Sequence, residues 1–147
     1  MLYLSKLPFV GHNDGTREEV ISWLAENFVG IGCEIRDANV GRYIIGNPFL
    51  SFKPLGRLSF LSTIDKIELN VLENSIGLKI VSTYRVVFLT IVALAIGYNI
   101  VDRLYYNATD AMKIGLTAFI AIILVMMIFY VNALRAKSFA RRALKSG

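Results

Sequence analysis

The chain has few of the residues that most often build reactive sites. Among 147 residues it has one cysteine, Cys33, and one histidine, His12. A single cysteine excludes a disulfide within one chain, and these two residues are too few for a structural zinc site. The glycines form neither a G-x-G-x-x-G turn nor a Walker loop. We therefore expect no catalytic residues, no cofactor and no metal ion.

Acidic residues are missing from one end of the chain, and this locates the net charge of +5. Residues 1–85 carry nine basic and nine acidic side chains, and residues 102–113 carry two of each. The remaining cations follow the last apolar run: Arg135, Lys137, Arg141, Arg142 and Lys145. The basic balance thus describes a tail rather than a nucleic-acid-binding domain, and we expect no nucleic acid partner.

Two long apolar runs, at 86–101 and 114–131, account for most of the hydrophobic content of 55%. As helices they measure about 24 and 27 Å, and flanking residues extend each toward the roughly 30 Å of a bilayer core. We predict transmembrane helices at 82–104 and 113–134, a short external link at 105–112 and a basic cytoplasmic tail at 135–147. The alternative, a buried hairpin of a soluble protein, requires more covering surface than so small a domain offers.

The placement of lysine and arginine predicts the orientation of this hairpin. Basic residues lie before the first run and after the second, whereas the link is neutral. The positive-inside rule then places both termini in the cytoplasm, and we expect a bacterial inner (cell) membrane. Aromatic rings with a polar tip favour the opposite interface, where the sequence has Tyr98, Tyr105 and Tyr106.

Residues 1–85 predict a cytoplasmic α+β domain with one helix on a mainly antiparallel sheet. Thr16 and Glu19 have the spacing of a capping box, and an amphipathic helix follows to about Phe28. Strands are expected at 31–35, 40–45, 49–52, 58–61, 64–71 and 76–80, the last two as a hairpin with one wet face. The last strand continues through residues 82–85 into the first apolar run without a flexible linker.

Two groups of residues are candidate interaction sites. Ala93 and Gly97 are four apart, a small-xxx-small pair that permits close helix packing, either within the hairpin or against another subunit. The tail cations can bind anionic lipid headgroups, each contributing about 1 kcal/mol, or can serve only to fix the orientation. The lipid-headgroup candidates are Arg135, Lys137, Arg141, Arg142 and Lys145.

These patterns favour a non-catalytic two-pass membrane protein that acts as an anchoring, adaptor or accessory subunit of a larger membrane complex. Its expected partners are the lipid bilayer and other membrane protein subunits. Two alternatives remain open. One is a small-ligand or lipid-handling protein, with a cavity lined by Trp23, Phe49, Phe52 and Phe60. The other is a homo-oligomeric membrane assembly that uses the Ala93 and Gly97 face.

Overall fold

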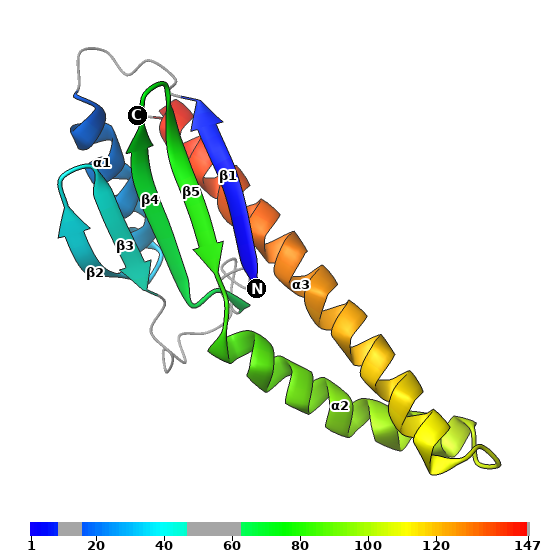
Figure 1. Ribbon diagram of the computed structural model, residues 1–147. Helices are drawn as coiled ribbons and strands as arrows, with labels where there is room; N and C mark the ends of the chain where they lie inside the picture. The colour runs from blue at the N-terminus through cyan, green and yellow to red at the C-terminus, as the bar shows by residue number, and fades with distance from the viewer. Residues whose placement is uncertain (9–15, 47–62, 147) are drawn as a thin grey trace.

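The chain folds into an α+β domain from which a long helical hairpin projects (Figure 1). The computed structural model describes residues 1–8, 16–46 and 63–146. The described strands are β1 (Leu2–Pro8), β2 (Glu34–Asn39), β3 (Arg42–Gly46), β4 (Lys66–Leu72) and β5 (Ser75–Val81). The described helices are α1 (Arg17–Gly30), α2 (Tyr84–Leu104) and α3 (Asp110–Ser146). The α+β class is confirmed, while the expected strands at 49–52 and 58–61 lie outside the described residues.

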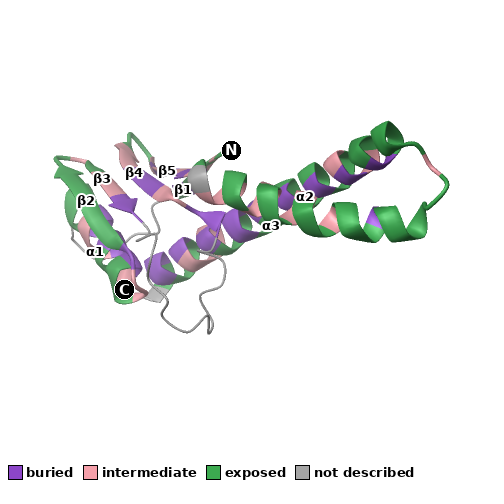
Figure 2. Cartoon of the chain, turned by 90° about the horizontal axis from the view of Figure 1, so that it is seen from below, coloured by how far each residue is buried: buried purple, intermediate pink, exposed green. Residues whose placement is uncertain are grey.

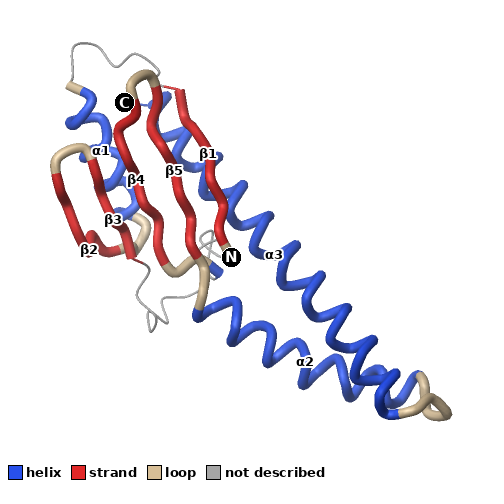
Figure 3. The backbone as a smooth tube through the Cα atoms, in the orientation of Figure 1, coloured by secondary structure: helices blue, strands red, loops and turns tan. Residues whose placement is uncertain are grey.

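The five strands form one antiparallel sheet in the order β1-β5-β4-β3-β2. Strands β2 to β5 are neighbours in chain order, whereas β1 pairs with β5 at the far side (Figure 3). The segment that contains α1 therefore carries the chain from one edge of the sheet to the other. The sheet has one face on the core and one face open, as the alternation in β4 and β5 predicted.

Helix α1 begins at the predicted capping box. The Glu19 N–H donates to Thr16 Oγ1 at 3.3 Å, and the Thr16 N–H donates to Glu19 Oε2 at 2.8 Å. These reciprocal bonds satisfy two of the amide groups that a helix start leaves without partners. The apolar stripe then faces the sheet, with Val20, Leu24 and Phe28 buried.

The β2–β3 hairpin differs from its prediction by a few residues. Strand β2 begins at Glu34, after the buried Cys33, and it continues to Asn39, through residues 37–39 where the sequence predicts a turn between two strands. The chain reverses instead at Gly41, whose φ of +72° suits glycine. A register shift between Ile35 and Asp37 marks an irregularity of the bulge type in β2. This irregularity interrupts the alternation of side chains with a period of two, from which the bounds of the strand at 31–35 were predicted.

The largest difference from expectation is that two helices, not one, cover the sheet. Helix α3 runs without a break for 37 residues, about 55 Å, and its last part packs behind the sheet beside α1 (Figure 1). Residues 135–146, expected to belong to a tail, are thus part of this helix, and four of them lie in the core of the domain. The α3 residues buried there are Phe129, Ala133, Ala136, Ala140, Ala143 and Leu144. Alanines at this spacing present only methyl groups, so the helix can lie close to its neighbours.

The hairpin formed by α2 and the first part of α3 extends away from the domain (Figure 2). Both helices are long and apolar enough to cross a membrane, and their most apolar windows are only 11% and 22% buried. At the tip, Lys113 Nζ lies 2.6 Å from the Asp102 carboxylate. Along the contact, a Cβ added to Gly97 would lie 3.1 Å from the Thr117 methyl. The predicted small pair therefore has Gly97 within the hairpin contact.

We predict that Gly97→Leu destabilises the hairpin, whereas Gly115→Leu does not. The new side chain at 97 must displace α3, and such overpacking costs about 1–3 kcal/mol. A Cβ at Gly115 meets no atom within 4 Å, which makes it the matched control on the facing helix. Thermal unfolding of both variants in the same detergent measures the difference. Equal melting temperatures would contradict the assigned contact.

Candidate functional site

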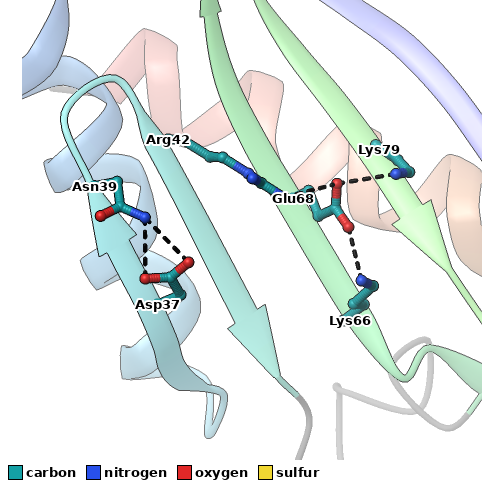
Figure 4. A network of polar contacts seen from close by, with 6 residues as sticks. All are labelled: Asp37, Asn39, Arg42, Lys66, Glu68 and Lys79. Atoms are coloured by element: carbon teal, nitrogen blue, oxygen red, sulfur yellow. Dashed lines mark hydrogen bonds and ion pairs between the residues drawn. The ribbon is translucent and has the colours of Figure 1, made fainter.

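The open face of the sheet carries a compact ionic cluster centred on Glu68 (Figure 4). Glu68 lies on the central strand β4, and three cations from β3, β4 and β5 surround it. Lys66 Nζ lies 2.8 Å from Glu68 Oε1, while Lys79 Nζ and an Arg42 Nη lie 3.0 and 3.8 Å from Oε2. The register places Lys79 opposite Glu68, so strand pairing itself brings these charges together.

The carboxylate in this cluster is enclosed, whereas its cations remain partly in solvent. The Glu68 side chain is 5% exposed, and those of Arg42, Lys66 and Lys79 are 48%, 38% and 39% exposed. The hydrogen bond from Lys66 holds the pKa of Glu68 below its ordinary value, and Lys79 acts in the same direction against the effect of burial. One acid among three bases leaves the cluster with a net positive charge.

We predict that Glu68→Gln lowers stability at neutral pH by about 1–3 kcal/mol, the scale of a charged hydrogen bond. Because the folded-state pKa of Glu68 lies below its ordinary value of 4.5, the native ion pairs stabilise the fold above that pH. This contribution is lost as pH falls through the folded-state pKa. The gap between wild type and variant should therefore shrink on acidification.

Urea unfolding at about pH 7 and about pH 3.5, followed by the fluorescence of the single tryptophan, Trp23, measures this gap. The exposed Glu73 in the β4–β5 turn provides a matched control through Glu73→Gln. A gap that is constant with pH would refute the assigned role of the Glu68 carboxylate.

A second polar group ties the hairpin to the domain at the end of β5. Asn132 of α3 donates from Nδ2 to Thr63 Oγ1 at 3.0 Å, and Ser82 Oγ donates to the Thr63 carbonyl. All three residues are buried. Beside them, Arg85 Nε in the first turn of α2 lies 3.6 Å from Asp65 Oδ1, and Asp65 also accepts from the Thr83 N–H. Buried polar groups with satisfied partners fix one arrangement of the elements that carry them.

The structure divides the five tail cations between two sides of α3. Tyr130 meets Tyr3 of β1 edge-on, with ring centroids 6.1 Å apart. Lys137 and Arg141 follow Tyr130 by seven and eleven residues, so the helical period places them on the same side as β1. Arg135 and Arg142 fall on the other flank, and Lys145 lines a hollow with Pro8 and Arg141.

The remaining candidate residues are also placed by the structure. Cys33 is buried, and burial raises the pKa of its thiol to about 11, so it stays protonated and unreactive near neutral pH. His12, Phe49, Phe52 and Phe60 lie outside the described residues. Within the described ranges, no three His, Cys, Asp or Glu side chains gather as a metal site.

Trp23, the remaining member of the expected apolar cavity, lines an open hollow of about 380 Å³ between α1 and α3. Phe139 and Ile31 contribute apolar surface to the same hollow, with Glu26, Asn27 and Gly30 around them. Trp23 therefore lies on the helical side of the domain, away from the open face of the sheet.

Sequence reasoning missed Glu68, Asn132 and the position of β1 at an edge of the sheet formed by the described strands. The alternation of Lys66, Glu68 and Asn70 indicates only that Glu68 lies on the solvent-facing side of a strand. It does not indicate which residues surround Glu68. Asn132 bonds a residue 69 positions away, for which the sequence offers no local signal. No protein-family model, curated protein or solved structure matches this chain.

Proposed function

We propose that this chain is a two-pass membrane protein that holds a non-catalytic α+β domain at the cytoplasmic surface, as an adaptor or accessory subunit of a larger membrane assembly. The observation that carries the proposal is the continuity of α3. One helix forms half of the hairpin and, further along, part of the domain core. The domain and the hairpin are therefore one mechanical unit.

The surface of the hairpin supports its place in a bilayer. Large apolar side chains are exposed along both helices, among them Phe88, Ile91, Phe119 and Met127. A core helix of a soluble protein is mostly buried by other parts of the protein, whereas most residues in the apolar windows of these two helices are not buried. On α3 the apolar stretch 114–134 measures about 31 Å, close to the thickness of a bilayer core.

The charges at the two ends of the hairpin support the cytoplasmic orientation. At the tip, the Lys113 charge is paired with Asp102. At the domain end, Arg85 lies in the first turn of α2, and Arg135 and Lys137 follow the apolar stretch of α3. An excess of lysine and arginine beside the ends of membrane helices marks the cytoplasmic side.

The way in which the domain is held supports the role of an adaptor. Strand β5 ends at Val81 and α2 begins at Tyr84, so the first connection has almost no slack. The second connection is α3 itself, and the Asn132–Thr63 bond reinforces it. A domain fixed at two points presents its open sheet face and edges in a constant orientation. Such a domain loses little conformational freedom when another subunit binds, and this favours docking.

We predict the orientation as follows. In a Cys33→Ser background, a membrane-impermeant maleimide should label Asn107→Cys in intact cells, because the link lies outside. Lys145→Cys should react only after the membrane is permeabilised. Mass shifts on gel electrophoresis measure both. Labelling of position 145 in intact cells, with position 107 protected, would show the opposite orientation.

The adaptor role predicts a heteromeric particle. After extraction of native membranes with a mild detergent, native mass spectrometry should show this chain together with at least one other polypeptide at constant stoichiometry. A strictly monomeric particle would contradict the proposal. A particle that contains only copies of this chain would support the homo-oligomeric alternative instead.

A further inference from the structure

Strand β1 lies at an edge of the sheet, and its backbone register shows which groups face outward. Met1 and Ser82 exchange both backbone hydrogen bonds, at 2.6 and 3.0 Å. Bonded and non-bonded pairs alternate along an antiparallel ladder. The residues of β1 that bond β5 are therefore Tyr3, Ser5 and Leu7. The residues whose N–H and C=O groups point to the open edge are Leu2, Leu4 and Lys6.

The two edges of the sheet differ in how they are protected. Natural edge strands avoid unwanted pairing through charged side chains, bulges or proline. Strand β2 has Glu34, Arg36 and Asp37, and its pairing with β3 is interrupted. Strand β1 keeps an unbroken register with β5 over all seven residues. Its only charge is Lys6, and its only proline is Pro8, at its last position. Leu2 and Leu4 are 56% and 66% exposed. Among the described strands, β1 thus has the edge better suited to pairing.

The surroundings of this edge are positive. Lys6 lies on the strand, and Lys137 and Arg141 lie on the side of α3 that meets β1. Pro8, Arg141, Leu144 and Lys145 line a hollow of about 220 Å³ at the far end of the strand. Helix α3 has no acidic residue after Asp110. The charge complement of this edge is therefore a segment that carries aspartate or glutamate.

Anionic lipid is a poorer match for the farther cations. Along α3, Arg141 and Lys145 lie about 9 and 15 Å beyond Arg135, where the apolar stretch has ended. The field of an anionic leaflet falls off within a Debye length of about 8 Å. Arg135 and Lys137 stay within that layer, whereas the others project beyond it.

A second copy of this chain is also a poor match. Antiparallel pairing of two β1 edges needs a twofold axis perpendicular to the sheet, which reverses the direction of every strand. The hairpin leaves the domain at one end of the strands (Figure 3). The hairpin of the second copy would therefore point away from the membrane that holds the first.

We propose that the β1 edge receives an extended, acidic segment of another polypeptide, which adds to the sheet beside β1. Main-chain hydrogen bonds from Leu2, Leu4 and Lys6 provide the pairing, and Lys6, Lys137 and Arg141 select acidic side chains. The inference rests on the proposed adaptor function and names the surface through which that function acts.

The test uses the full chain in lipid nanodiscs and a fluorescent peptide of alternating valine and glutamate, with a valine–lysine peptide for comparison. The glutamate peptide should bind at least tenfold more tightly. Binding should slow amide hydrogen exchange at Leu4 and Lys6 by at least tenfold. The amides of Ser5 and Leu7 should change little, because they already bond β5.

Two pairs of variants separate this inference from a general loss of structure. Leu4→Pro removes an outward N–H and no ladder bond, and should weaken binding at least tenfold, whereas Leu4→Thr keeps the N–H and should bind nearly as wild type. Lys137→Glu with Arg141→Glu should abolish the preference for the glutamate peptide. Arg135→Glu with Arg142→Glu, on the other flank of the same helix, should preserve it.

Four results would overturn the inference. The first is an absence of binding at millimolar peptide, and the second is equal binding of both peptides. The third is a native heteromeric particle that keeps its composition in the Leu4→Pro variant, because the partner would then dock elsewhere while the adaptor function stood. A photo-crosslinking residue at Lys6 that captured only lipid, or only a second copy of this chain, would also reject it.

Discussion

The structure depends on one constraint: the single helix α3 forms both the exposed apolar hairpin and part of the core of the α+β domain. The first part of α3 is exposed and apolar. The last part packs against α1 and β1 and buries Ala133, Ala136, Ala140 and Ala143 in the core. Small side chains let a helix lie close to its neighbours without leaving voids. Because the helix has no described break between these parts, the hairpin cannot tilt without carrying the helical layer of the domain with it. The buried Asn132–Thr63 bond lies where the two environments meet.

Because α1 and α3 cover the same face of the sheet, the opposite face stays available for interactions. The helices cover one face, so the face with Glu68, Lys66 and Lys79 remains open (Figure 4). Enclosing one carboxylate among three cations fixes their side chains and leaves excess positive charge on that face. The β1 edge and the cations of α3 extend the positive charge around the side of the domain. Both surfaces keep a constant orientation because the domain is held at two points.

Local features of the sequence predicted the capping box at Thr16, the β4–β5 hairpin and the two long apolar helices, because each depends on neighbours in the chain. The packing of residues 135–144 against the domain was missed because alanine is only weakly apolar. Four cations between the alanines and a fifth after them resemble a solvated tail, although the spacing of Ala133, Ala136, Ala140 and Ala143 is helical. The cluster around Glu68 and the Asn132–Thr63 bond depend on contacts between distant segments. No local pattern contains that information.

The position of β1 relative to the hairpin narrows the kind of partner that fits the proposed edge. Met1, the residue before β1, pairs with Ser82, two positions before α2 begins. Seven strand residues then extend about 23 Å away from that point. A strand added to β1 would therefore run beside the domain from the membrane surface outward. Another membrane subunit can reach this edge without a long linker, through a segment that directly follows or precedes one of its membrane helices. A freely diffusing soluble partner must instead approach between the strand and the lipid surface. The geometry therefore favours an acidic juxtamembrane segment of a neighbouring membrane subunit.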